Sequence, residues 1–348
     1  MKCLIIFVGL SLFFAWNARA QQRTEALSRI HFGSCIKQAE PVPIFGTILK
    51  ENPELFLMVG DNIYADTHDM AEMQVKYDQL AAIPLFQKLK KSCPILATWD
   101  DHDYGLNDAG FEYPEKDESQ KLFLDFWGDS EDSPRRTRKG VYDSVSIGPQ
   151  GKHVQVILMD TRYFRGPLKV GEKRTGGKYY PEIDPEVTML GDEQWAWLED
   201  ELTKPADLRV IVSSIQFVAS AAGQETWANL PAERERMLKL IGETQADHVI
   251  FISGDRHWSD ISMQKDGAAP YPIYDLTSSG LNQIHPRGTP TDNDYRITKK
   301  TYHKPNYGVI AIDWEKGIVN LEIRDLEGAL VMEEEVSLAL LKVSGGEK

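Results

Sequence analysis

The sequence predicts an α/β protein, and three patterns support this fold class. Short apolar runs alternate with helical patterns along most of the chain, which is typical of a sheet built from strand–helix units. Several of these runs stop abruptly at Gly, Asp or His, as residues 55–59 do before Gly60-Asp61. Near the end of the chain, three β-type runs are joined by short turn sequences, which indicates antiparallel hairpins. Ligands bind at the carboxyl edge of such sheets.

The first half of the chain contains four of the predicted strands. Residues 29–32 form a weakly alternating run that ends at Gly33-Ser34-Cys35, and residues 55–59 and 94–99 are apolar runs that end at Asp61 and Asp100. A short helix is expected at 43–52, where Pro43 begins it and Asn52-Pro53 ends it. Further helical patterns cover 70–91 and 119–127, and residues 154–159 form a buried strand that ends at Asp160.

The second half begins with a segment, 166–184, that is rich in Gly, Lys, Tyr and Pro and is expected to be a long surface loop. Asp192 is expected to cap a helix whose apolar residues recur at helical spacing. Strands follow at 209–215 and 249–253, with an amphipathic helix at 231–243 between them. The final hairpins are expected at 307–314, 318–324 and 330–336.

The N-terminal segment has the features of a secretory signal. Lys2 precedes an apolar stretch at 4–16, which is too short to span a bilayer, and Ala18-Arg19-Ala20 fits a small-x-small cleavage site. Cleavage after Ala20 would leave residues 21–348, which we expect to form one secreted or periplasmic domain, with no transmembrane segment.

Charge and cysteine content narrow the function further. The formal net charge is −14, and an acidic surface argues against specific nucleic-acid binding. Two cysteines remain beyond the signal segment, Cys35 and Cys93. In an oxidising compartment the default expectation is one disulfide, but Cys35 closes a strand exit whereas Cys93 precedes an apolar strand. Whether they pair therefore stays open at this point.

Three polar clusters at strand ends carry the candidate chemistry. Asp61 and Tyr64 lie three residues apart after the second strand; in isolation this pattern is more often a turn with a core tyrosine. The run 100–103, Asp-Asp-His-Asp, places carboxylates so close together that they raise one another's pKa unless cations or donors compensate. One of these aspartates can ligate a metal while His102 donates to phosphate or to a leaving group. Asp255 and His257, at i and i+2, are either two metal ligands or part of a capped turn.

Three further residues are weaker candidates. Arg162 and Arg165 follow a strand that ends at Asp160, and their guanidinium groups fit either a phosphate or an ordinary salt bridge. Gln216 follows the 209–215 strand, where a glutamine is usually only a surface residue.

In their order along the chain, these motifs resemble those of the PhoD-type alkaline phosphatases and phosphodiesterases, members of the calcineurin-like metallophosphoesterase superfamily. The resemblance covers residues 29–313 and extends in site design to purple acid phosphatases. The motifs that carry it are Phe-Gly-Ser-Cys at 32–35, Gly-Asp-Asn-Ile-Tyr at 60–64, Trp-Asp-Asp-His-Asp at 99–103, Asp-Thr-Arg at 160–162, the helix start at 190–198, Ser-Ser-Ile-Gln at 213–216 and Gly-Asp-Arg-His at 254–257.

The resemblance implies a four-layer α/β/β/α sandwich, and hydrolysis of a phosphate ester by metal-activated water at a di- or trinuclear site. It implies that Cys35 and Tyr64 are ligands of ferric iron (Fe³⁺) and that Asp61 bridges to a second cation, calcium (Ca²⁺) or another divalent metal. The remaining implied site residues are Asp101, Gln216, Asp255 and His257 as metal ligands, and Asp100, His102 and Arg162 as catalytic groups.

Two departures from the family pattern concern access to the site: only a short stretch precedes the Cys35 motif, where relatives often have a β-rich domain, and no shielding C-terminal helix is evident. The substrate is expected to be a phosphate ester of a small molecule, lipid or polymer. The choice between mono- and diesters and the oligomeric state stay open.

Two other functions are weighed against this one. A glycoside hydrolase would use Asp61 and Asp101 as its carboxylate pair, would survive a chelator, and would leave Cys35 and Tyr64 without a role. A secreted, calcium-stabilised binding domain would depend on metal for stability but would turn over no substrate.

Overall fold

The computed structural model describes residues 24–174, 176–286 and 293–343. The signal segment expected at 1–20 lies outside these residues. Among the helices of the described ranges, none has the length and apolar character needed to cross a membrane.

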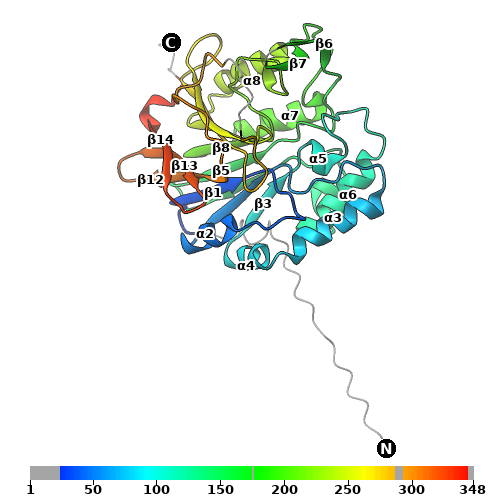
Figure 1. The fold of residues 1–348 in the computed structure, drawn as a ribbon. Helices are drawn as coiled ribbons and strands as arrows, with labels where there is room; N and C mark the ends of the chain where they lie inside the picture. The colour runs from blue at the N-terminus through cyan, green and yellow to red at the C-terminus, as the bar shows by residue number, and fades with distance from the viewer. Residues whose placement is uncertain (1–23, 175, 287–292, 344–348) are drawn as a thin grey trace, which may run out of the picture.

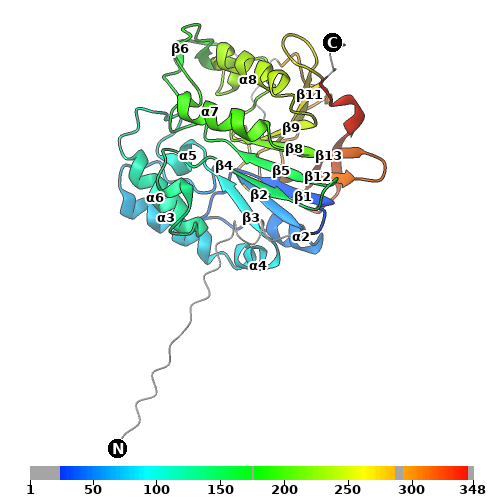
Figure 2. The ribbon, with the colours of Figure 1, turned by 180° about the vertical axis from the view of Figure 1, so that it is seen from behind.

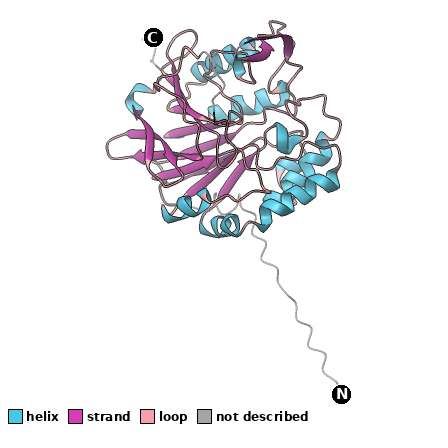
Figure 3. Ribbon diagram, in the orientation of Figure 1, coloured by secondary structure: helices cyan, strands magenta, loops and turns pink. Residues whose placement is uncertain are grey.

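Two six-stranded sheets pack face to face at the centre of the molecule (Figures 1 and 3). The first sheet has the order β14 (Leu330–Ser337), β13 (Ile318–Asp325), β12 (Asn306–Asp313), β1 (Arg29–Gly33), β2 (Leu55–Val59) and β3 (Ile95–Thr98). The second has the order β10 (Ser259–Gln264), β11 (Ile273–Ser278), β9 (Val249–Ser253), β8 (Leu208–Ser213), β5 (Val154–Leu158) and β4 (Asp143–Ile147). A separate hairpin joins β6 (Lys169–Arg174) and β7 (Gly177–Tyr180).

The parallel strands of each sheet point their carboxyl ends the same way. In the first sheet β1, β2 and β3 are parallel, and β12, β13 and β14 extend it as an antiparallel meander. In the second sheet β5, β8, β9 and β11 are parallel, with β4 and β10 as antiparallel edges. Residues that follow the parallel strands are therefore gathered at one edge of each sheet.

Helices cover the outer faces of both sheets (Figure 2). The first sheet is covered by α2 (Ile44–Lys50), α3 (Met70–Ala82), α4 (Pro84–Ser92) and α6 (Lys116–Trp127). The second is covered by α7 (Gly191–Leu202) and α8 (Pro231–Glu243). The short helix α5 (Asp101–Tyr104) follows β3 directly. The result is the α/β/β/α layering that the family resemblance implies.

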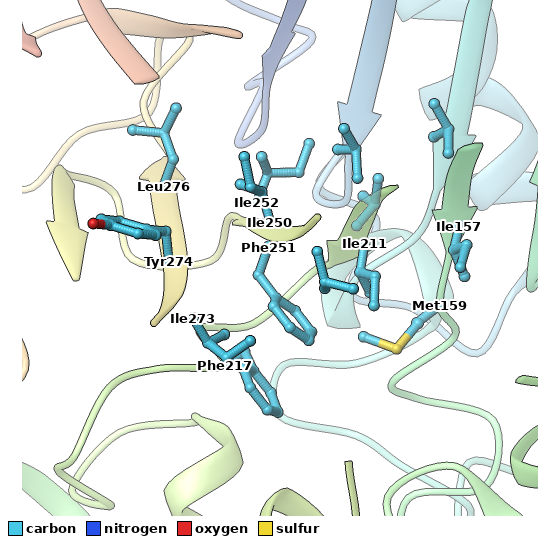
Figure 4. Close-up of a cluster of buried hydrophobic side chains, with 14 of the residues drawn as sticks. Ile157, Met159, Ile211, Phe217, Ile250, Phe251, Ile252, Ile273, Tyr274 and Leu276 are labelled. Atoms are coloured by element: carbon cyan, nitrogen blue, oxygen red, sulfur yellow. The ribbon is translucent and has the colours of Figure 1, made fainter. Parts of the chain in front are cut away.

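Alternation along β2 shows how one strand serves two cores. Leu55, Leu57 and Val59 belong to the cluster between the sheets, whereas Phe56 and Met58 pack against the helices of the first sheet. The inter-sheet cluster continues through β5, β8, β9 and β11 (Figure 4). Both faces of these strands are buried, which explains their continuous apolar sequence.

The expected strands and helices are largely confirmed, with four corrections. The helical stretch expected at 70–91 is two helices, because Ile83 is extended and Pro84 begins α4. The expected loop at 166–184 contains the β6–β7 hairpin. Strands β4, β10 and β11 were not predicted.

The fourth correction concerns the start of α7, where Asp192 is not the cap. Leu190 occupies the N-cap position, and Asp192 lies in the first turn. One local and one long-range contact satisfy the N–H groups near this helix start. The Gly191 N–H donates to Thr188 Oγ1 at 2.8 Å, and the Met189 N–H donates to Glu233 Oε2 of α8 at 2.6 Å.

Candidate metal centre

The polar residues that follow four parallel strands meet at one place. Cys35 follows β1, Asp61 follows β2, Asp101 begins α5 after β3, and Asp255 and His257 follow β9. Ligand atoms of Cys35, Asp61 and His257 lie within 4.8 Å of one another. The two sheets thus contribute to a single centre, as the carboxyl edge of parallel strands predicts.

Four of these residues have left-handed backbone conformations. The φ angles are +64° at Cys35, +49° at Asp61, +66° at Asp255 and +57° at His257. Aspartate and histidine tolerate this region better than most residues, but it still costs free energy, and non-glycine residues there often mark functional sites. The loops therefore turn sharply at the residues whose side chains enter the centre.

Cys35, Tyr64 and His257 form one side of the centre around Asp61. Asp61 Oδ2 lies 3.3 Å from the Cys35 sulfur and 3.2 Å from the Tyr64 hydroxyl, which is also 2.7 Å from His257 Nε2. Burial, together with the charge of Asp61, raises the pKa values of both Cys35 and Tyr64 well above their usual ranges. Neither group is ionised at neutral pH without a nearby cation, which is how a metal converts such groups into ligands.

Carboxylates form the other side. Ligand atoms of Asp100, Asp101 and Asp255 lie within 4.8 Å of one another, as do those of Asp61, Asp101 and His102. Burial raises the pKa of Asp61 well above its usual value, and the neighbouring Asp101 adds to this effect. Burial likewise raises the pKa values of Asp100 and Asp255 to about 7. This mutual repulsion is relieved when a cation binds.

Two of these carboxylates keep an oxygen without a partner. Asp61 Oδ1 and Asp100 Oδ2 are buried and have no hydrogen-bond donor among the residues that the structure describes. A buried carboxylate oxygen without a donor is costly. The residues present therefore fit a bound cation, and oxygen donors of this kind suit hard metals such as calcium, whereas the thiol and phenol of Cys35 and Tyr64 suit a stronger Lewis acid.

His102 borders the centre on α5. Its Nδ1 lies 2.8 Å from Asp66 Oδ1, so Nε2 is left for other partners. Burial lowers the pKa of His102, but the charges of Asp61 and Asp101 outweigh this and raise it to about 11. These charges favour the protonated imidazole, which can donate a proton from Nε2.

Arg162 is fully buried beneath Asp100. Its Nε donates to Asp100 Oδ1 at 2.6 Å and its Nη1 donates to Glu225 Oε2 at 2.7 Å. Ser214 donates to the same Asp100 oxygen at 2.6 Å. Arg162 thus orients Asp100, and its predicted contact with phosphate stays a prediction that this buried position does not favour.

Asp103 connects the loops after β2 and β3. Its Oδ1 accepts from the backbone N–H of Asp61 at 3.1 Å and of Asp100 at 2.7 Å. Its Oδ2 accepts from the backbone N–H of Asn62 at 3.3 Å and from the Asn62 side chain at 2.5 Å. Within the acidic run 100–103, Asp103 therefore serves as a scaffold.

Gln216 and the two cysteines are the remaining predicted residues that the structure describes. The Gln216 amide donates to Thr277 Oγ1 at 2.8 Å and to Asp260 Oδ1 at 3.2 Å, a second buried polar group. Its role as a ligand stays a prediction. Cys35 is a free thiol beside Asp61, whereas the Cys93 sulfur lies 3.9 Å from the Leu89 carbonyl oxygen.

Several residues of the site had no sequence signal that would have revealed them. Glu225 is buried and pairs with Arg162, and His285 Nε2 lies 3.1 Å from His257 Nδ1. Asp108 donates its backbone N–H to Asp101 Oδ2 at 2.6 Å. These residues lie in irregular loops, where periodicity gives no information. His285 could have been flagged only as one of the chain's eight histidines.

A cleft of about 260 Å³ opens over the centre. Its lining includes Asp101, His102, Asp255 and His257, so these predicted residues are accessible to a ligand. Residues of the β6–β7 hairpin and of the loop at Gly223-Gln224 line the same cleft.

Comparison with known proteins identifies the arrangement. The model of the PhoD-like phosphatase family matches residues 31–325. A curated relative, alkaline phosphatase D of Bacillus subtilis (strain 168), is 25% identical over an alignment of 258 residues that covers 60% of this chain and 42% of the relative. The matched region therefore spans less than half the length of that protein.

Solved structures agree on the fold. The structure of PhoD superposes with a TM-score of 0.72 at 18% identity, over 94% of this chain and 74% of that chain. Purple acid phosphatase PPD1 from yellow lupin (Lupinus luteus) seeds superposes with a TM-score of 0.64 at 13% identity, over 90% of this chain and 54% of that chain. The fold is thus similar to those of PhoD and of a purple acid phosphatase.

Proposed function

The chain belongs to the PhoD-like phosphatase family, and from this membership we propose that it hydrolyses phosphate esters at a metal centre formed by its strand-end residues. The observation that carries the proposal is the convergence of Cys35, Asp61 and His257, within 4.8 Å of one another, beside the carboxylates of Asp100, Asp101 and Asp255. A thiol, a phenol, an imidazole and several carboxylates at one buried point make a donor set for two cations of different hardness.

We assign the two sides of the centre to different metals. Cys35, Tyr64 and His257 would hold Fe³⁺, because a thiolate and a phenolate need a strong Lewis acid. Asp101 and Asp255 would hold Ca²⁺ or another divalent ion through oxygen, and Asp61, which has two oxygens, would bridge the two sites. When bound, such cations offset the carboxylate charge, polarise a phosphoryl oxygen and lower the pKa of water toward neutrality.

The chain's own residues supply the remaining steps. Asp66 fixes the ring of His102 through Nδ1, which leaves Nε2 to donate a proton to the departing alkoxide oxygen. Arg162 and Ser214 hold one oxygen of Asp100, so its second oxygen is kept in a fixed position. His285 orients the ring of His257, because His285 Nε2 lies 3.1 Å from His257 Nδ1.

The two alternative functions are less well supported. Oxygens of Asp61 and Asp101 lie within 4.8 Å of each other, together with His102. A retaining glycosidase separates its carboxyl groups by about 5–5.5 Å and an inverting one by about 6.5–9.5 Å. The spacing of Asp61 and Asp101 is thus shorter than in an inverting enzyme. A glycoside hydrolase and a plain calcium-binding domain both give Cys35 and Tyr64 no role.

The test uses the full chain with metals bound. We expect turnover of p-nitrophenyl phosphate or bis(p-nitrophenyl) phosphate, loss of activity with a chelator, and iron and calcium by elemental analysis. Asp101→Ala should lower kcat/KM by more than about 100-fold, whereas the matched Asp69→Ala at the start of α3 should not. Activity that survives both the chelator and Asp101→Ala would refute the proposal. The ratio of the two rates gives the preference for mono- or diesters.

We also infer that residues 21–348 act as one exported unit. One hydrophobic cluster contains residues of both sheets, which supports a single folding unit. The expected signal segment supports export. N-terminal sequencing of the mature protein should begin at Gln21, and a mature protein that begins at Met1 would contradict export by cleavage.

A further inference from the structure

The β6–β7 hairpin forms a wall of the cleft that faces the metal centre. Lys173, Gly177, Lys178 and Tyr179 line the same cleft as Asp101, His102, Asp255 and His257. These four residues are called the hairpin wall below. They lie in the Gly/Lys/Tyr-rich segment that was expected to be a long surface loop and that the proposed hydrolysis does not use.

The hairpin wall packs against the Gly223 loop at Gly177 and Tyr179. Gly177, at φ +131°, packs so closely on the Gly223 loop that an added Cβ would lie 1.8 Å from the Gly223 carbonyl oxygen. Tyr179, which follows Lys178 in the chain, donates its N–H to the same Gly223 carbonyl oxygen at 3.1 Å, and its side chain is buried. Lys178 is therefore an exposed side chain on a fixed backbone.

Asp108 joins this wall to the floor of the cleft. Its carboxylate accepts from the Tyr179 hydroxyl and lies 3.1 Å from Lys178 Nζ, while its backbone N–H donates to Asp101 Oδ2 at 2.6 Å. A single residue thus connects Lys178 to a proposed metal ligand. The distance between wall and centre is set by this connection and by the Gly177–Gly223 contact.

The charge of the wall is opposite to that of the chain. The protein has a formal net charge of −14, yet the hairpin presents Lys173 and Lys178 to the cleft. Lys178 is 51% exposed, and an ammonium group has three donors, of which Asp108 uses one. Two charged donors remain for a ligand. An anion in the cleft could then contact the centre and the wall together.

We propose that the hairpin wall is a second anion subsite that selects phosphate esters carrying a further negative group, a phosphate or carboxylate, on the substituent away from the scissile bond. The inference rests on the proposed phosphoesterase function and names its substrate class. The reacting phosphate would lie over the strand-end residues, and Lys173 and Lys178 would contact the distal anion.

The kinetic test compares two diesters with the same leaving group. These are p-nitrophenyl propyl phosphate and p-nitrophenyl 3-phosphonopropyl phosphate, which differ only in the distal phosphonate. We expect wild type to prefer the second by about 10-fold in kcat/KM at low salt, since each exposed ion pair contributes up to about fivefold. The preference should shrink at 1 M NaCl, where the Debye length is about 3 Å.

Substitutions test whether Lys173 and Lys178 cause the preference for the diester with the distal phosphonate. Lys173→Ala combined with Lys178→Ala should reduce the ratio of the two kcat/KM values to about 1, and Lys178→Arg, which keeps the charge, should retain most of it. Lys239→Ala on α8 is the matched control: it removes the same charge from a lysine that is 59% exposed and lies outside the cleft lining. It should leave the ratio at the wild-type value.

A binding measurement separates this inference from the proposed function. Calorimetry with propylphosphonate and propane-1,3-bisphosphonate, on metal-loaded protein whose metal content is checked before and after, gives the same ratio without turnover. Tighter binding of the bisphosphonate that is lost in the double variant supports the subsite even if neither ester is hydrolysed. A ratio that is the same in wild type, the double variant and Lys239→Ala, in both assays, would overturn it and identify the lysines as solvated surface residues.

Discussion

Asp103 is the residue whose substitution tests the architecture of the site most directly. It is fully buried and accepts four hydrogen bonds, two on each oxygen, from the loops that carry Asp61 and Asp100. Asp103→Asn keeps the shape of the side chain but replaces one oxygen by an NH₂ group. Whichever way the amide is oriented, its NH₂ group then faces two N–H groups that donated to the replaced oxygen.

The expected loss of stability follows from the number of hydrogen bonds that Asp103→Asn breaks. Two hydrogen bonds are lost, and two buried N–H groups are left without an acceptor, at a cost of about 1–3 kcal/mol each. We therefore expect Asp103→Asn to lower the free energy of unfolding by about 4 kcal/mol, a large part of the 5–15 kcal/mol typical of a folded domain (about 10 at the centre of that range).

The assay is urea denaturation followed by tryptophan fluorescence, with a chelator present so that metal binding does not add to stability. The control is Asp69→Asn at the N-cap of α3, whose carboxylate also accepts two backbone N–H groups. Asparagine caps a helix about as well as aspartate, so the control should change stability by less than about 0.5 kcal/mol. If Asp103→Asn were as stable as this control, the role assigned to Asp103 would be wrong.

Three further predictions concern other parts of the molecule. Burial raises the pKa of Glu51, but hydrogen bonds from His31 and Tyr307 and the charge of Arg324 lower it to about 2. Because this folded-state pKa is below the ordinary value of 4.5, ionised Glu51 stabilises the fold above about pH 4.5, and this stabilisation is lost as the pH falls toward 2. The difference in Tm between wild type and Glu51→Gln should therefore be larger at pH 6 than at pH 2.5. A difference that is the same at both pH values would show that Glu51 does not have the lowered pKa. Tyr64→Phe removes the hydroxyl that contacts Asp61 and His257. It should remove the tyrosinate-to-iron component of the visible absorption, leave any component from Cys35, and weaken iron binding by at least about 10-fold, as measured by spectrophotometric titration. A spectrum and an iron affinity identical to those of wild type would exclude Tyr64 as a ligand. Gly177→Ala should loosen the hairpin and speed tryptic cleavage at Lys178, whereas Gly151→Ala, with φ +83° but no atom within 4 Å of the added Cβ, should not; equal cleavage rates in both variants would show that the Gly177–Gly223 contact does not hold the hairpin.

The strand-end residues were predictable because a simple rule places them. An apolar run that stops at Asp61, Asp101 or Asp255 has to end at the carboxyl edge of its sheet, and parallel neighbours bring these ends together. The amphipathic pattern of α8 gave its bounds as Pro231–Glu243, because Pro231 begins the helix and its apolar face packs on the second sheet.

Residues whose position depends on tertiary contacts could not be found in this way. Glu225 contacts Arg162 and Arg165, and His285 contacts His257; these partners are far away in sequence. The hairpin escaped prediction because β6 and β7 are short and polar, with no alternation to mark them. Asp192 looked like a helix cap, but Glu233 of α8 takes over that region through long-range contacts.

The left-handed backbone at Cys35, Asp61, Asp255 and His257 has a consequence for how such proteins evolve. At about 1 kcal/mol for each residue, the four positions together cost the fold about 4 kcal/mol that glycine would largely recover. Selection for chemistry therefore works against selection for stability at these positions. A lineage that no longer needed the reaction would be free to drift toward glycine or asparagine at all four. Its members should melt at higher temperatures than their active ancestor, so greater thermal stability would mark the loss of function in this fold.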